Sequence, residues 1–213
     1  MDIRRTPLLT ARDTARHLEM PESTLDTWIA TRVRGGSMVH AVTPGKRGWP
    51  RMPFVAIIEA YVLRSLRDMG VSMEEIRRAA DVVRREFRDD YALASQRIAT
   101  DGVALFVELA DRSLVHVKDN QLGIREVLDD YLRYISWGES GEPTRLQLRQ
   151  YPMAAQVVID PRFGWGAPVL ARTKVPVDAI RDLWKAGGES IRVVAEEFDL
   201  TPDVVEDVLR VAA

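Results

Sequence analysis

Cysteine is absent from this chain of 213 residues. The absence excludes disulfide bonds and thiolate metal sites, and it fits a reducing compartment such as the cytosol. The histidines His17, His40 and His116 are far apart in the sequence, and no cysteine joins them in a ligand pattern. We therefore expect neither a metal nor a cofactor.

Long hydrophobic runs are missing as well. No apolar stretch approaches the roughly 20 residues that a membrane-spanning helix needs. The opening Met-Asp-Ile-Arg-Arg-Thr-Pro has no apolar centre of the kind found in signal peptides. We expect a cytoplasmic protein with no membrane partner. Its 46% hydrophobic residues suffice for one large domain or two to three small ones.

Catalytic motifs cannot be recognised either. The acidic pairs lie in or beside helical patterns, where a solvated face is the simplest explanation; they are Asp89-Asp90, Asp129-Asp130 and Glu196-Glu197. Segment 164–168 lacks the Lys and the Ser or Thr of a phosphate-binding loop. No spacing of Ser, His and Asp supports a triad. We predict no catalytic residue and no enzymatic activity.

The net charge of −2 conceals an uneven distribution. Residues 1–88 carry a net charge of +5, residues 89–144 one of −6, and residues 145–213 one of −1. A phosphate backbone attracts a basic segment and repels an acidic one. The N-terminal third is thus the candidate for DNA binding, and the acidic middle suits dimerisation or a protein partner.

Residues 11–31 have the pattern of two short helices joined by a tight turn. Thr10 is a good N-cap for a helix over 11–18, and a second helix is expected from about Glu22 to Thr31. Short hydroxyls and an aromatic ring at its start suit contact with phosphates and base edges; they are Ser23, Thr24, Thr27 and Trp28. The alternative is an ordinary capped helix with Trp28 in the core.

Residues 32–53 lack a helical pattern. Turn signals at 34–37 and 43–46 flank the apolar run 38–42, which predicts a β-wing. Five basic residues and no acidic one occur between positions 32 and 51, namely Arg32, Arg34, Lys46, Arg47 and Arg51. Such charged loops are often merely solvated. Next to a helix-turn-helix, however, the cluster favours contact with DNA phosphates.

Two stronger helices follow the basic segment. The first is expected over about 53–69, with Gly70 as its C-terminal cap. The second begins at Ser72, where Glu75 completes a capping box, and reaches Phe87.

With these elements in place, residues 7–88 resemble the MerR-like winged helix-turn-helix DNA-binding domain. The residues that carry the resemblance are Thr24-Leu25, Trp28, Gly48-Trp49, Arg51, Leu66, Gly70-Val71-Ser72 and Glu75-Ile76. Pro50 and Pro53 interrupt the family's aromatic-Arg-aromatic wing motif. Asp89-Asp90 follows where sensing members have a long dimerising helix, so effector sensing is not implied. A homodimer is expected, because helix-turn-helix proteins usually bind two half-sites.

The middle segment, residues 89–150, has mixed patterns. Two runs within 103–118 predict a β-hairpin, a periodic run predicts a helix over 123–135, and 145–149 alternates like a strand. We interpret the segment as an acidic α/β connector, with dimerisation or a partner surface as its possible roles.

The C-terminal domain, residues 151–213, is expected to hold three helices over 178–186, 190–198 and from Thr201 onward. Its motifs resemble those of the "domain of unknown function four-three-three" family; they are Asp160-Pro161, Gly166-Ala167-Pro168, Thr173 and Pro176-Val177, with Arg172 where the family often has Gly. The resemblance implies an antitoxin of a VapB-like toxin–antitoxin module, whose partner resembles a PIN-fold ribonuclease.

The last two helices, residues 190–212, form a second helix-turn-helix pattern. The final helix presents Asp203, Glu206 and Asp207, which DNA phosphates would repel. A small packed domain, a dimer interface or a toxin-facing surface is the better interpretation. We assign no residue to toxin binding.

The sequence therefore predicts a mainly α protein of the α+β class. It would join a winged helix-turn-helix (1–88), a β-containing middle segment (89–150) and a three-helix domain (151–213). The expected function is that of an antitoxin that neutralises a ribonuclease toxin and represses its own operon through double-stranded operator DNA. The alternative is a stand-alone MerR-like transcription regulator without a toxin.

Overall fold

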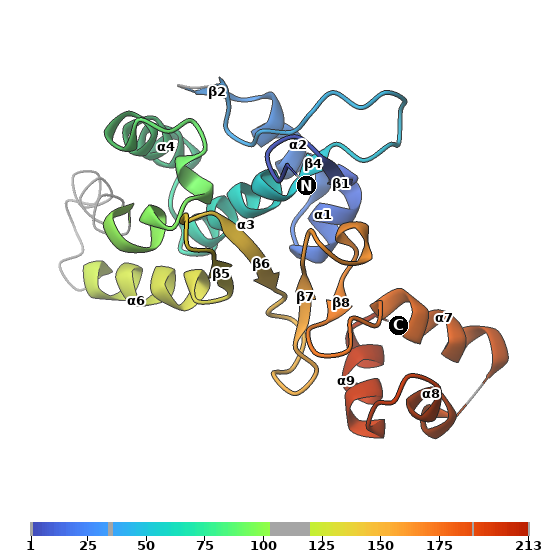
Figure 1. Ribbon diagram of the computed structural model, residues 1–213. Helices are drawn as coiled ribbons and strands as arrows, with labels where there is room; N and C mark the ends of the chain where they lie inside the picture. The colour runs from blue at the N-terminus through green and yellow to red at the C-terminus, as the bar shows by residue number, and fades with distance from the viewer. Residues whose placement is uncertain (1, 34–35, 103–119, 189, 213) are drawn as a thin grey trace. The chain divides into compact units, whose positions relative to one another are not determined.

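The computed structural model describes residues 2–33, 36–102, 120–188 and 190–212. The chain divides into two compact units, Met1–Thr144 and Arg145–Ala213. Each unit is described by itself below, and Figure 1 labels the helices and strands. Within the described residues, no helix is long and apolar enough to cross a membrane.

The first unit begins with the expected helix-turn-helix. Strand β1 (Pro7–Leu9) leads into α1 (Ala11–His17), and α2 (Glu22–Ala30) follows. The hydroxyl of Thr10 accepts the backbone N–H of Asp13 at 3.0 Å, so Thr10 is the N-cap that the sequence predicts.

The wing segment is less regular than expected. Strands β2 (Arg32–Val33) and β3 (Gly36–Ser37) pair antiparallel, and β4 (Met52–Pro53) pairs with β1. The predicted β-wing thus has its paired strands before and after the apolar run 38–42, which is not itself a strand. Its first two residues, Met38 and Val39, are fully buried, so they serve the core instead of extending a sheet. We refer to residues 38–51 as the wing loop.

Two long helices form the centre of this unit. In α3 (Phe54–Asp68), nearly every side chain is buried, so this helix is surrounded by protein. In α4 (Met73–Phe87), only one face is buried. Ser72 and Glu75 form the predicted capping box, since each side chain bonds the backbone N–H of the other residue.

The described part of the middle segment packs on α3. Short helices η1 (Ala92–Ala94) and η2 (Ile98–Gly102) precede α6 (Asn120–Leu132), which lies three residues N-terminal to its expected position. The tyrosine ring of Tyr61 fixes α6, because its hydroxyl donates to the carbonyl of Tyr131 at 3.0 Å. The β-hairpin expected over 103–118 lies outside the described residues.

Strand β5 (Ile135–Trp137) and the first residues of β6 (Pro143–Gln147) form a hairpin in the first unit. In the second unit, the end of β6 pairs with β7 (Val157–Ile159), and β7 pairs with β8 (Val169–Leu170). The strand expected over 145–149 is thus present, shifted by two residues.

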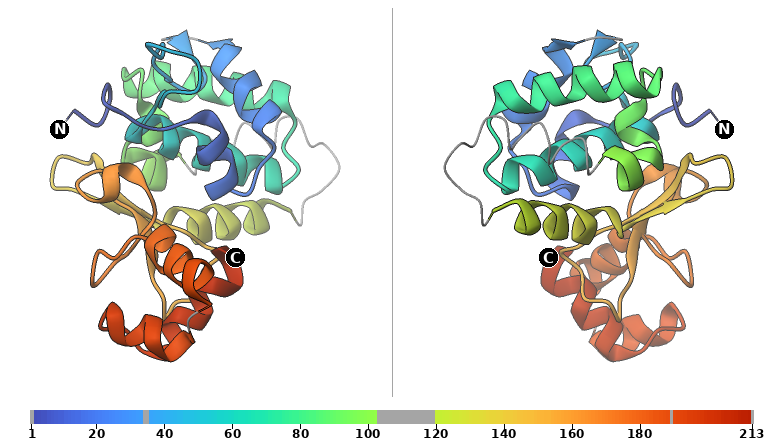
Figure 2. Two further views of the ribbon diagram at one scale, coloured as in Figure 1. Left: turned by 90° about the vertical axis from the view of Figure 1, so that its right-hand side faces the viewer. Right: turned by 90° about the vertical axis from the view of Figure 1, so that its left-hand side faces the viewer.

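Three helices complete the second unit, as the sequence predicts: α7 (Val177–Gly187), α8 (Ile191–Glu197) and α9 (Pro202–Ala212). They pack against one another and are drawn in orange and red in Figure 2. Their shared core contains Ile180, Val194 and Val208. The mainly α, α+β class is confirmed.

Candidate nucleic-acid interface

The exposed face of α2 carries hydroxyls and carboxylates but no cation. Its exposed residues are Glu22, Ser23, Asp26, Thr27 and Ala30, and the helix has no Lys or Arg. Hydroxyls can accept from or donate to base edges, whereas carboxylates repel phosphates and accept from the amino group of cytosine. Positive charge for the phosphate backbone must therefore come from other elements.

Trp28 is not on that face. Its side chain is only 1% exposed, and its indole N–H donates to the sulfur of Met73 at 3.3 Å. The prediction that Trp28 contacts DNA is wrong. Leu25, Trp28 and Ile29 share the buried face of α2, because positions three and four apart meet on a helix. Trp28 instead joins α2 to the start of α4.

The three hydroxyl residues differ in accessibility. Ser23 and Thr27 are exposed, and Thr24 is half-buried. The hydroxyl of Thr27 donates to the carbonyl of Ser23 at 2.8 Å, which leaves its oxygen free to accept a further bond. DNA contact by these residues stays a prediction.

The basic residues of the wing segment separate into different environments. Lys46 and Arg47 are exposed on the wing loop, and the ammonium of Lys46 lies 5.4 Å from the ring centre of Trp49. Arg32 is exposed on β2 and donates to the hydroxyl of Ser37. Arg34 lies outside the described residues.

Arg51 is the most constrained of these cations. Its backbone N–H donates to the carbonyl of Leu9 at 2.9 Å, and its carbonyl accepts from Val42 at 2.8 Å. Its guanidinium is 3.9 Å from the carboxylate of Asp26 on α2. Arg51 Nε is buried and has no hydrogen-bond partner within the described chain. Arg51 thus connects the end of the wing loop to the exposed face of α2.

A groove of about 580 Å³ separates the helix-turn-helix from the wing loop. Charged and aromatic groups of both signs line it, including Arg12, Asp13, Glu22, Asp26, Arg47, Trp49 and Arg51. Arg12 is exposed and lies 3.3 Å from the carboxylate of Glu22. Sequence reasoning missed Arg12, and it placed the half-exposed Trp49 in the wing only through the family resemblance, without a role in the site. The first stands on α1, outside the basic cluster, and the second lies between Gly48 and Pro50.

Buried charges fix the start of the wing loop. Glu59 of α3 accepts from the backbone N–H of His40 at 2.8 Å and lies 2.7 Å from the ring Nδ1 of that residue. Arg84 of α4 donates to the carbonyls of Ser37 and Met38 at 2.9 and 3.0 Å. The two long helices therefore determine where the wing loop leaves the core.

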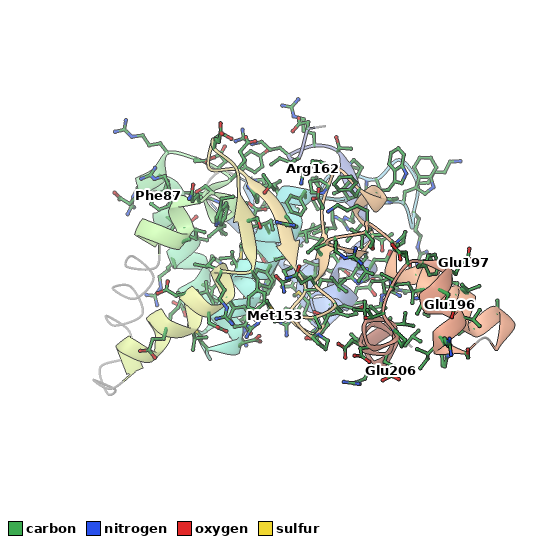
Figure 3. All side chains as sticks on the ribbon, turned by 60° about the horizontal axis from the view of Figure 1, so that its bottom comes forward. Phe87, Met153, Arg162, Glu196, Glu197 and Glu206 are labelled. Carbon is green, nitrogen blue, oxygen red and sulfur yellow. The ribbon has the colours of Figure 1, made fainter. Side chains whose placement is uncertain are left out.

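The second helix-turn-helix has an acidic surface. Asp203 and Glu206 are exposed on α9, and Figure 3 labels Glu206 together with Glu196 and Glu197 of α8. Asp207 is half-buried and lies 3.6 Å from Arg210. Within α9 the carboxylates of Asp203, Glu206 and Asp207 outnumber the single cation, Arg210, so the helix repels DNA phosphates on balance.

Metal-binding groups do not gather in the described part of the chain. No set of three His, Cys, Asp or Glu side chains there is arranged to hold an ion. The charged and hydroxyl groups near the wing loop can bind an anion or the polar edge of a base.

Comparison with known proteins finds two matched families, one in each of the two units of the chain. Residues 7–80 match the family described as "Putative DNA-binding HTH domain", and residues 157–212 match "Protein of unknown function (DUF433)". The chain is 33% identical to "Putative antitoxin VapB45" of Mycobacterium tuberculosis, over 95% of this chain and 92% of that protein.

The chain belongs to the VapB-like antitoxin family. The crystal structure of Rv2018 from Mycobacterium tuberculosis is also similar, with a TM-score of 0.79 and 32% sequence identity. The match covers 95% of this chain and 97% of that one. In this VapB-like chain, the residues that line the groove beside α2 all lie within the matched helix-turn-helix segment 7–80.

Proposed function

We propose that this protein is an antitoxin that neutralises a partner ribonuclease toxin of the PIN-like class. The similarity to "Putative antitoxin VapB45" carries the proposal, because it extends over 95% of the chain and includes both matched domains. A similarity confined to the helix-turn-helix would support only a DNA-binding role.

Operator binding is the second part of the proposal. The helix-turn-helix and wing loop, in a MerR-like domain over residues 1–88, would bind double-stranded operator DNA as a homodimer and repress the antitoxin's own operon. Ser23, Thr27 and the half-buried Thr24 would meet base edges or phosphates. Arg32, Lys46, Arg47 and Arg51 would meet the phosphate backbone, and so would Arg34.

The toxin part is tested by co-expression with the product of the adjacent reading frame. An antitoxin should restore growth that the neighbouring protein suppresses, and the two proteins should purify as a complex. If the neighbour is not toxic and does not bind, the chain is the alternative, a stand-alone MerR-like regulator without a toxin.

The DNA part is tested by fluorescence anisotropy on the promoter fragment at several salt concentrations. Arg47→Ala should weaken binding on all sequences and reduce the salt slope by about 1, because one phosphate contact is lost. Arg192→Ala is the matched control, since it removes an exposed cation from α8 in the second unit. Equal losses in the two variants would contradict the assignment.

The acidic helix provides a further control. The triple variant Asp203→Ala, Glu206→Ala, Asp207→Ala should not weaken operator binding if the N-terminal domain makes the contact. A loss of affinity as large as that caused by Arg47→Ala together with Arg51→Ala would mean that the DNA binds the second helix-turn-helix, and it would contradict the proposal.

A further inference from the structure

The turn that joins β7 to β8 presents a tryptophan to solvent. Trp165 is 88% exposed, far more than any other large hydrophobic residue that the structure describes. Its φ of +52° lies in the left-handed region, which favours Gly or Asn over a bulky side chain. Exposure and backbone strain both oppose a tryptophan here, so its presence calls for a partner surface.

The backbone of the turn that carries Trp165 is held by contacts on its N-terminal side. Asp160 is fully buried, and its carboxylate accepts two bonds from the guanidinium of Arg162, at 2.9 and 2.7 Å. Gly164 has a φ of +60°, and a Cβ there would meet Val169 at 2.8 Å. A rigid aromatic side chain loses little conformational entropy on binding, which makes it an effective anchor.

The cations beside Trp165 are already engaged within the loop. Arg162 is bonded to Asp160, and the ammonium of Lys174 donates to the carbonyl of Ala171 while lying 4.8 Å from the ring centre of Phe163. A surface for single-stranded nucleic acid needs cations that can follow the phosphates. Because both cations are bonded within the loop, an apolar pocket on a protein suits Trp165 better than a nucleic-acid strand does.

A pocket of suitable chemistry exists in the same unit. It measures about 460 Å³ and is lined by Met153, Leu170, Arg172, Thr173, Leu200 and Val204, among others. Methionine sulfur and an arginine guanidinium both make favourable contacts with aromatic rings. The hydroxyl oxygen of Thr173 is buried without a partner in the described chain, whereas the indole N–H of Trp165 needs an acceptor when buried.

Trp165 and the pocket stand at opposite ends of the β7–β8 hairpin. The tryptophan is in the turn, while the pocket is lined by residues 153–156 and 170–173 at the open end. Figure 3 shows Arg162, in the turn, well apart from Met153, at the pocket. Two hairpins placed antiparallel would bring each turn to the other's open end, which is the reciprocal contact of a closed two-fold dimer.

From this complementarity, we infer that Trp165 inserts into this pocket, which Met153 and Thr173 help to line, on a second copy of the chain. The contact is reciprocal, so the second copy's Trp165 occupies the same pocket of the first. The indole would fill the pocket, its N–H would donate to Thr173 Oγ1, and Arg172 would lie at the rim. This inference specifies a contact that would form the homodimer proposed above. The contact itself forms without DNA and without the toxin.

Sedimentation of the full chain over a range of concentrations tests the exchange. The wild-type protein should form dimers, and Trp165→Ala should weaken their association by about thirtyfold or more, as expected for a central tryptophan anchor. Trp49→Ala is the matched control, because Trp49 is also exposed but lies in the other unit. A monomeric wild-type protein, or a dimer unaffected by Trp165→Ala, overturns the inference.

Thr173→Val tests the pocket itself. The hydroxyl has no partner among the described residues of one chain, so its removal should leave thermal stability unchanged, while dimer association should weaken about tenfold through two lost hydrogen bonds. Unchanged association would rule out this pocket as the acceptor. If Trp165→Ala weakens toxin binding but leaves self-association unchanged, Trp165 contacts the toxin, and the inference is overturned.

The cysteine-free sequence allows a direct geometric test. A tagged Phe163→Cys chain is mixed with an untagged Arg172→Cys chain and treated with a short bis-maleimide. The exchange predicts a tagged–untagged cross-link that disappears when Trp165→Ala is added. Val193→Cys, exposed on α8, replaces Arg172→Cys as the control and should give no cross-link. Equal yields from the two partners would overturn the inference.

Discussion

Arg84 of α4 and Glu59 of α3 form an ion pair in which neither side chain is exposed, with 3.4 Å between Nη2 and Oε1. Both residues also bond the wing loop, Arg84 through the carbonyl of Met38 and Glu59 through His40, and Arg84 donates to the carbonyl of Ser37 in β3 as well. The pair therefore connects three segments: the two long helices and the wing loop. Removing one partner would leave the other charged and buried.

Replacing Arg84 should therefore destabilise the fold strongly. We expect Arg84→Met to lower the free energy of unfolding by about 3–5 kcal/mol, because buried Glu59 and two carbonyls lose the guanidinium that they share. Urea denaturation followed by circular dichroism measures the change. Arg85→Met, at the exposed neighbouring position, should change stability by less than about 0.5 kcal/mol. Comparable losses in both variants would show that the buried pair has no special role.

Trp28 provides a test that separates stability from recognition. Trp28→Phe keeps an aromatic ring in the core but removes the indole N–H that donates to Met73. Stability should fall by about 1–3 kcal/mol through the lost volume and hydrogen bond, while the folded variant should bind promoter DNA as the wild type does. Denaturation and anisotropy measure the two quantities. A large loss of DNA affinity without loss of stability would return Trp28 to the interface.

The difference between prediction and structure at Trp28 has a simple geometric origin. Helical spacing places residue 28 beside both Thr24 and Leu25, so it is compatible with a hydroxyl-bearing exposed face and with an apolar buried face. The sequence cannot decide between them, because the choice depends on α4, which lies 45 positions later at Met73. Local signals such as the caps at Thr10 and Ser72 were predictable, since their partners are three residues away.

The wing loop illustrates the same limit. Its basic residues are evident in the sequence, and so are its turns. Its path is not, because buried Glu59 and Arg84 hold it through contacts 19 and 46 residues apart in the chain. A buried carboxylate within the apolar pattern of α3 was the available signal. The groove partners Arg12 and Asp26 depend on the same long-range packing and could not be assigned from sequence.

Asp26 should oppose DNA binding in the wild-type protein. Its carboxylate is exposed on α2 and lies 3.9 Å from Arg51. Asp26→Asn should strengthen non-specific binding several-fold in dilute salt, because it removes a charge that repels phosphates and releases Arg51 toward them. The gain should shrink at high salt. Asp182→Asn, at an exposed pair on α7, is the control and should have no effect. Weaker binding to all sequences in the Asp26 variant would contradict this role.

The Asp160–Arg162 pair should make stability depend on acidity. Burial raises the pKa of Asp160, but the hydrogen bonds and charge of Arg162 outweigh it and hold the pKa below its ordinary value of 3.8. A depressed pKa in the folded state adds stability that is complete above the unfolded value and is lost as the pH falls through the folded one. The wild-type protein should therefore lose this contribution below about pH 4.

Asp160→Asn isolates that contribution, because the amide cannot change its charge. At pH 7 the variant should be less stable by about 1–2 kcal/mol, a value reduced because Arg162 is largely exposed. The difference between variant and wild type should narrow as the pH falls below about 4, since protonated Asp160 no longer attracts Arg162. Urea denaturation at a series of pH values measures it. A difference that stays constant down to pH 2 would mean that the pair's charge does not stabilise the turn that carries Trp165.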